Sequence, residues 1–206
     1  MPARYAKTRD IAAKYDGTAD EHYDRRYKDV QFQKYDLLLA HAERLLGSST
    51  VTRLLRDIVV DSGCGSGLLV AWLAERRLIG GVRIVGIDIS AGMLAMAKQK
   101  APRRPGIDFI QATAELPPLR DGISAVACSI STYQNLDPLQ QEAYIIALRQ
   151  LLRANDALLL FSVLKKSLDE AGLASISAMI RNSLPLGLLV PDDGRVEDRM
   201  LVHATS

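Results

Sequence analysis

The sequence predicts an α/β protein: a mostly parallel sheet of about seven strands, with helices on both faces and an N-terminal helical cap. After residue 50, short apolar runs alternate with longer segments of helical periodicity, which is the pattern of βαβ units. A glycine-rich segment directly follows the first apolar run, as it does where α/β sheets bind nucleotides. The 206 residues suffice for one domain without disulfide or metal support.

The first 50 residues are polar and rich in tyrosine. Five of the seven tyrosines lie here: Tyr5, Tyr15, Tyr23, Tyr27 and Tyr35. Residues 31–46 place apolar side chains on one helical face, and the Gly-Ser-Ser that follows ends this helix. Because about 50 polar residues make a poor independent core, we expect residues 1–50 to be a helical cap on the same domain and residues 51–206 to be its core.

The rest of the chain alternates between strands and helices. β-branched residues predict a buried strand at 58–60, and apolar periodicity predicts a helix at 68–77. Ser90 is a suitable N-cap for a helix over Ala91–Lys100, which Pro102 closes. The other expected elements are strands at 82–87, 107–111, 123–130, 157–164, 186–190 and 200–204 and helices at 138–153 and 167–182. Right-handed crossovers between such strands give a Rossmann-like sheet with helices on both faces.

The composition excludes several classes of protein. Hydrophobic residues make up 48% and charged residues 24%, as in ordinary folded proteins, so disordered and fibrous classes are excluded. The net charge of +2 carries no signature of a polyanion partner. The longest apolar run, 68–74, is far shorter than the ~20 residues that span a membrane, and no signal peptide is expected. Two cysteines, Cys64 and Cys128, make no disulfide framework, and we expect a cytoplasmic protein without a metal site.

The glycine-rich segment, residues 61–67, reads Asp-Ser-Gly-Cys-Gly-Ser-Gly. Its spacing is G-x-G-x-G, which differs from the G-x-G-x-x-G of dinucleotide sites and from the P-loop. Asp61 precedes the first glycine by two positions, where an acid would repel a pyrophosphate and suit a ligand with an amino group. Asp88 ends the second expected strand, about 20 residues after Gly67, where an acid accepts hydrogen bonds from ribose hydroxyls.

Together these residues resemble the class I S-adenosylmethionine-dependent methyltransferases. Residues 61–67 resemble the glycine motif that cradles the methionine part of the cofactor in that family, and Asp88 resembles its ribose-binding acid. The N-terminal Tyr15-Asp16, Tyr23-Asp24 and Tyr27 resemble the cap of the ubiquinone- and menaquinone-methyltransferase-like branch, the type 11 branch.

The resemblance implies a cofactor and a set of site residues. The cofactor would be S-adenosylmethionine, with S-adenosylhomocysteine as its product. The residues assigned to it are Asp61, Gly63, Cys64, Gly65, Gly67, Asp88, Ile89, Met93, Thr113, Ala114, Glu115 and Ser129. The candidates for the substrate pocket are Tyr23, Tyr27, Tyr133 and Asn135, and no catalytic residue is assigned.

The sequence departs from the family pattern in three places. The stretch after the third strand, residues 111–114, lacks the acid that often reads the adenine amine, so backbone groups with Thr113, or Glu115, would hold the adenine. Ile-Ser replaces the usual Phe-Asp at 123–124, and Ala-Asn-Asp replaces the usual Pro-Gly-Gly at 154–156. Asn and Asp tolerate turn geometry, so we expect the turn to persist.

We therefore expect direct methyl transfer to a small molecule by a monomer or homodimer, without nucleic acid or membrane as a partner. Two alternatives remain open at this point. A methyltransferase of RNA or protein would use the basic cluster Lys98, Lys100, Arg103 and Arg104. A catalytically silent module would bind the cofactor without turnover. A nicotinamide-dependent oxidoreductase is disfavoured by the glycine spacing.

Overall fold

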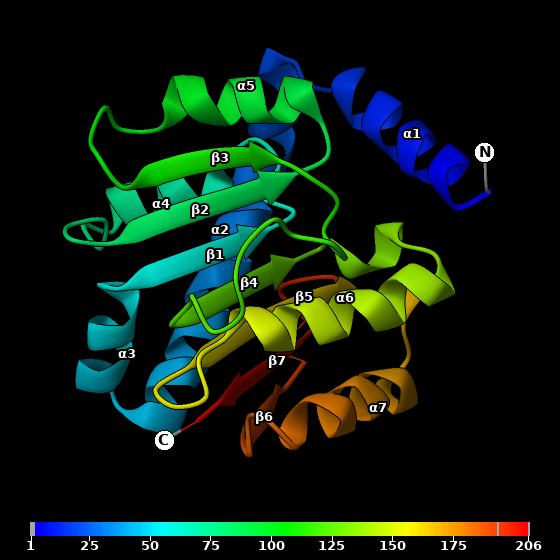
Figure 1. The fold of residues 1–206 in the computed structure, drawn as a ribbon. Helices are drawn as coiled ribbons and strands as arrows, with labels where there is room; N and C mark the ends of the chain where they lie inside the picture. The colour runs from blue at the N-terminus through cyan, green and yellow to red at the C-terminus, as the bar shows by residue number, and fades with distance from the viewer. Residues whose placement is uncertain (1–2, 193, 206) are drawn as a thin grey trace.

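In the computed structural model, which describes residues 3–192 and 194–205, seven strands form one sheet in the order β3-β2-β1-β4-β5-β7-β6 (Figure 1). The strands are β1 (Ile58–Ser62), β2 (Arg83–Asp88), β3 (Ile107–Gln111), β4 (Val126–Ile130), β5 (Leu158–Leu164), β6 (Leu186–Val190) and β7 (Asp198–Ala204). Neighbours from β3 to β5 are parallel, whereas β7 is antiparallel to both β5 and β6. The predicted α/β fold with a mostly parallel sheet is confirmed.

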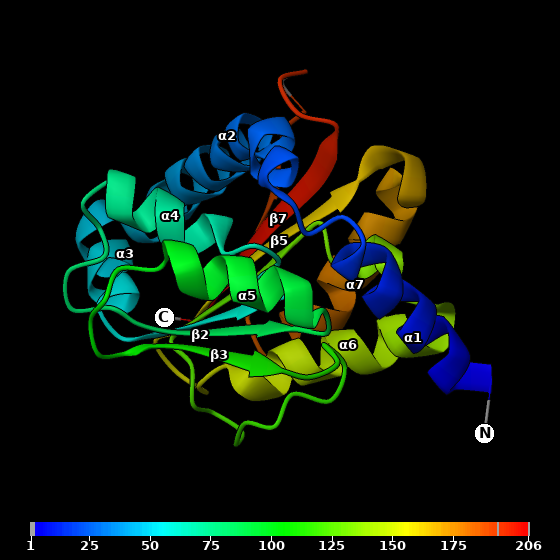
Figure 2. The same ribbon diagram turned by 90° about the horizontal axis from the view of Figure 1, so that it is seen from above.

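Helices cover both faces of this sheet (Figures 1 and 2). They are α1 (Ala3–Asp16), α2 (Glu21–Leu46), α3 (Ser48–Leu55), α4 (Leu68–Glu75), α5 (Ala91–Lys100), α6 (Pro138–Leu151) and α7 (Glu170–Arg181). One large apolar cluster joins α2, α3 and α4 to the sheet, and a second joins α6 and α7 to its other face. Among the helices of the described residues, none combines the length and the apolar character needed to cross a membrane.

Helix α2 is longer than expected and belongs to both the cap and the core. It begins at Glu21 because Asp20 accepts hydrogen bonds from the backbone N–H groups of His22 and Tyr23. Its second half buries Leu38 and Ala42 completely in the sheet cluster. The boundary at residue 50 therefore stays a prediction, since the cap's own helix forms part of the core. The short α3 was missed.

Several elements begin later than expected because a cap, a turn or an isolated bridge takes the place of their first residues. Strand β4 begins at Val126, since Ser124 forms only an isolated bridge with Leu152. Helix α7 begins at Glu170, because Asp169 caps it and Lys165–Ser167 forms a 3-10 turn. A second 3-10 turn, Tyr133–Asn135, follows β4. The carboxyl ends of β1, β2 and β4 meet at one edge of the sheet, where ligands bind in α/β folds.

Candidate cofactor and substrate site

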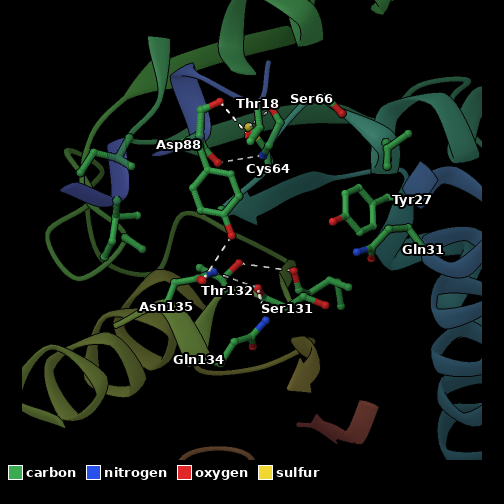
Figure 3. A pocket seen from close by; sticks show the side chains of 18 of the residues that line it. Thr18, Tyr27, Gln31, Cys64, Ser66, Asp88, Ser131, Thr132, Gln134 and Asn135 are labelled. Carbon is green, nitrogen blue, oxygen red and sulfur yellow. Dashed lines mark hydrogen bonds between the residues drawn. The ribbon is translucent and has the colours of Figure 1, made fainter. Parts of the chain in front are cut away.

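A cavity of about 650 Å³ lies at this edge of the sheet. The glycine loop after β1, the end of β2 and the segments after β3 and β4 form its floor and walls, and α1 with the first half of α2 closes it. Figure 3 shows Asp88 and Cys64 on one side and Ser131, Gln134 and Asn135 on the other, with Tyr27 and Gln31 reaching in from α2. The volume of the cavity falls within the range of about 300–1,000 Å³ usual for small-molecule sites.

The glycine loop owes its shape to contacts that only glycine permits. The backbone N–H groups of Gly63 and Cys64 both donate to the Ile87 carbonyl, at 2.7 and 2.9 Å. A Cβ on Gly63 would lie 2.1 Å from Thr132 Oγ1, so this loop can approach the β4 side only without a side chain. At Gly65, with φ +51°, a Cβ would meet no atom within 4 Å. The loop therefore presents open backbone to the cavity at Gly65.

Asp88 holds the loop while keeping acceptor capacity for a ligand. Its Oδ2 accepts the Gly65 N–H at 2.8 Å, and its Oδ1 accepts the Ser90 N–H at 2.9 Å. Burial raises the pKa of this carboxyl, although its backbone hydrogen bonds oppose the shift. Each carboxylate oxygen has room for about two hydrogen bonds, so both can still accept a hydroxyl from the cavity.

Asp61 lies beneath the loop and is only 3% exposed. Burial raises the pKa of its carboxyl to about 7, and the negative charge of Asp88 adds to the effect. The side chain does not line the cavity. It therefore carries a partial negative charge near neutral pH directly under the glycine loop.

Most of the residues predicted for the site come together around the cavity. The lining includes Gly63, Cys64, Gly65, Asp88, Ile89, Thr113, Ala114, Glu115, Tyr23, Tyr27 and Asn135. The predicted residues outside the lining are Asp61, Gly67, Met93, Ser129 and Tyr133. Their roles in binding stay predictions, and packing explains why the lining lacks them.

Packing explains why four of these five residues, all except Asp61, lie outside the lining. A Cβ on Gly67 would lie 2.9 Å from Ala97 Cβ, so this glycine serves the close approach of α4 to α5. Met93 of α5 is 1% exposed, and Ser129 is fully buried within β4. Tyr133 packs edge-on against Phe161 at a centroid distance of 5.7 Å. The ring of Tyr133 thus packs in the core and does not line the cavity, and its contact with a substrate stays a prediction.

The segment after β3 places a buried acid at the cavity. Glu115 is 6% exposed and accepts a hydrogen bond from Gln140 Nε2 at 2.9 Å. The same amide donates to Thr8 Oγ1 of α1 at 3.2 Å. Gln140 itself is fixed by the capping box that it forms with Asp137 at the start of α6. Glu115 and Thr113 therefore both lie at the cavity, and their contact with the adenine stays a prediction.

The turn between α1 and α2 is tied down on several sides. Asp16 Oδ1 accepts Ser90 Oγ–H at 2.5 Å and the Gly92 N–H at 2.9 Å, both at the start of α5. Tyr15 Oη donates to Asn135 Oδ1 at 3.2 Å across the cavity. Residues 15–24 thus form a lid over the cavity; we use this name for them below.

Asp24 ties the same lid to the glycine loop. It accepts a hydrogen bond from Ser66 Oγ at 2.5 Å and forms an ion pair with Lys100. Arg104, also in the basic cluster, donates to the Val82 carbonyl. Two of the four basic residues considered for RNA binding are therefore engaged in packing within the chain.

A buried ion pair at the far end of the cavity was not foreseen. Lys34 of α2 and Asp198 of β7 are each 3% exposed, and their charged groups are 2.9 Å apart. Ser131 joins them, since its Oγ accepts from Lys34 Nζ at 2.7 Å and donates to Asp198 at 3.0 Å. Ser131 has a left-handed backbone with φ +56°. No local sequence signal links residues so far apart in the chain.

Comparison with known proteins shows what the chain resembles. Residues 59–155 match the family described as methyltransferase domain. The magnesium-protoporphyrin O-methyltransferase of Rhodobacter capsulatus is 31% identical over 108 residues, which make up 50% of this chain and 46% of that protein. The chain thus spans about half the length of the curated relative that it matches.

Solved structures are similar over nearly the whole chain. The magnesium protoporphyrin IX methyltransferase of Synechocystis PCC 6803, solved with bound SAM, is 19% identical with a TM-score of 0.73, and the match covers 100% of both chains. The N-methyltransferase NodS of Bradyrhizobium japonicum, in complex with S-adenosyl-L-homocysteine, is 15% identical with a TM-score of 0.66 over 94% of this chain and 97% of its own. At these identities the similarity concerns the fold.

Proposed function

Residues 59–155 match the methyltransferase-domain family, and on that premise we propose that the chain transfers a methyl group from S-adenosylmethionine to a small-molecule acceptor. The observation that carries the proposal is the pairing of Gly65 with Asp88 at the cavity. An open glycine backbone stands beside a carboxylate that is already oriented and can still accept hydroxyls. A nucleoside with an amino-acid tail needs both features.

The residues around the cavity fit the parts of this cofactor. Asp88 would accept the ribose hydroxyls, and Glu115 with Thr113 would hold the adenine. Asp61 beneath the loop would attract the ammonium group of the methionine part. Tyr23 and Tyr27, whose rings are 4.8 Å apart, would offer aromatic faces to a positively charged sulfur.

When bound, S-adenosylmethionine supplies an electrophilic methyl group on a sulfonium. The protein then has to hold the acceptor in line with that methyl group, and proximity and orientation can lower the barrier by about 7–11 kcal/mol. Tyr15 and Asp24 tie the lid to opposite sides of the cavity, and a lid held in this way would exclude water during the transfer. No nucleophilic residue of the chain is required for this step.

The size of the site favours a small acceptor over RNA or protein. Cofactor and acceptor share about 650 Å³ beneath the lid, and part of the basic cluster is engaged within the chain. The similarity to magnesium-protoporphyrin O-methyltransferase favours an oxygen atom as the methyl acceptor. The cytoplasmic location and the monomeric or homodimeric state expected from the sequence stay predictions.

A calorimetric titration with S-adenosylmethionine and S-adenosylhomocysteine tests the proposal. We expect binding that weakens about tenfold in Asp88→Asn, a loss of about 1.4 kcal/mol. Asp108→Asn is the matched control, since Asp108 is exposed on the neighbouring β3 and does not line the cavity. Absence of binding by either ligand to the unaltered chain would overturn the proposal.

A further inference from the structure

The end of the cavity beyond the glycine loop is lined by polar groups that the cofactor does not need. Lys34 and Gln31 reach it from α2, Ser131 and Gln134 from the segment after β4, and Asp198 from the start of β7. Gln31 and Lys34 are three residues apart, so they share one face of the helix. We call these five residues the polar end of the cavity.

Lys34 is poorly explained by stability alone. A buried ion pair often contributes no more to stability than apolar residues of the same shape, because both charges lose their hydration. An ammonium group carries three N–H donors. The ion pair with Asp198 and the hydrogen bond to Ser131 occupy two of them, which leaves one for a molecule in the cavity that Lys34 lines.

Lys34 can donate a hydrogen bond to a bound molecule, whereas Gln134 can accept one. Its Nε2 donates to the Ser131 carbonyl at 2.6 Å, and this bond fixes which way the amide points. Its Oε1 is then buried without a hydrogen-bond partner among the described residues, and so is Gln31 Oε1. A buried acceptor without a donor is costly unless a ligand supplies the proton. The polar end therefore offers acceptors to a donor on the bound molecule.

We propose that the methyl acceptor carries a hydroxyl group that binds in the polar end, accepting a hydrogen bond from Lys34 Nζ and donating one to Gln134 Oε1. The inference rests on the proposed function and names the class of its substrate. A hydroxyl both donates and accepts, whereas a carboxylate or an ether only accepts and would leave Gln134 Oε1 unpaired. Val30 and Leu164 line the same cavity and suit an apolar body attached to the hydroxyl.

Ligand-observed NMR with three small ring compounds tests this assignment. Phenol donates and accepts, whereas anisole and benzoate only accept. Each is titrated into the protein with and without S-adenosylhomocysteine. We expect phenol to bind about five- to tenfold more tightly than the other two, as one buried hydrogen bond predicts.

Two matched variants connect the effect to the residue. Gln134→Met should weaken phenol binding about fivefold and leave anisole unchanged. Gln141→Met is the control, because its amide also donates to backbone carbonyls of this segment, those of Tyr133 and Leu136, but does not line the cavity. Circular dichroism confirms that both variants are folded.

Each outcome decides the inference. Preferential binding of phenol that only Gln134→Met abolishes supports it. Equal binding of the three probes, no binding of phenol, or equal loss in the two variants overturns it. Failure of S-adenosylhomocysteine to bind would instead overturn the proposed function, and the titrations without it still decide the role of the polar end.

Discussion

Replacing Asp61 with asparagine should stabilise the folded protein at pH 8 by about 4 kcal/mol. The pKa of this buried carboxyl is about 7, whereas its ordinary value is 3.8. Each pKa unit corresponds to 1.36 kcal/mol, so the ionised carboxylate lowers the stability by about that total once the pH exceeds 7. Asparagine has nearly the same shape and never ionises.

The pH dependence gives the sign of the effect. Below about pH 4 the carboxyl is protonated in both the folded and unfolded states, so the substitution changes little. Between about pH 4 and pH 7 only the unfolded chain releases the proton, and the stability of the unaltered protein falls relative to the variant. Above that range the difference is constant.

Urea unfolding of both proteins at intervals across this range measures the difference. Asp57→Asn is a control, for which the stability difference from the unaltered protein should change with pH in the opposite direction. Burial opposes ionisation of Asp57, but the Ile58 N–H and Arg153 outweigh it and lower the pKa of this carboxyl. Relative to the unaltered protein, that variant should lose stability as the pH rises to about 4, and the difference should stay constant above that pH. A difference for Asp61→Asn that does not change with pH would refute the reasoning, because it would show that burial does not disfavour the carboxylate.

Three further substitutions have expected outcomes. Gly63→Ala should destabilise the fold by about 1–3 kcal/mol in thermal unfolding, because its Cβ would overlap Thr132; full stability would contradict the close approach. Tyr144→Phe should cost about 1 kcal/mol, since its hydroxyl donates to the Ser62 carbonyl at 3.1 Å; an unchanged midpoint in urea would argue against that bond. Asp16→Asn should speed the release of S-adenosylhomocysteine in stopped-flow measurements without changing the melting temperature, and an unchanged rate would mean that the lid does not limit release.

The parts that the sequence predicted well are those with local signals. Helix α5 has the expected bounds, because Ser90 caps it and Pro102 follows it. The glycine loop and Asp88 meet because strands β1 and β2 are parallel neighbours, which the βαβ pattern implies.

The parts that escaped prediction depend on contacts between distant segments. Lys34 and Asp198 meet only because α2 crosses behind the antiparallel β7, and nothing local to either residue indicates it. The packing of the Tyr133 ring against Phe161 was not foreseen, because the sequence gives the residue's position after β4 but not the direction of its ring. The length of α2 was underestimated because its first half carries few apolar residues, so the N-cap Asp20 was the one local signal for its start.

The two halves of α2 have different roles. The first half helps to cover the cavity, and the second half packs in the core. The second half of α2 is fixed in the core by Leu38 and Ala42, whereas α1 is connected to it only through the turn at residues 17–20. A hinge for opening must therefore lie in or near that turn, because swinging all of α2 would tear the core apart. Proteolysis at the turn would then yield a stably folded protein whose cavity has lost the cover of α1 and keeps that of α2, so that this part of the cover can change without loss of stability.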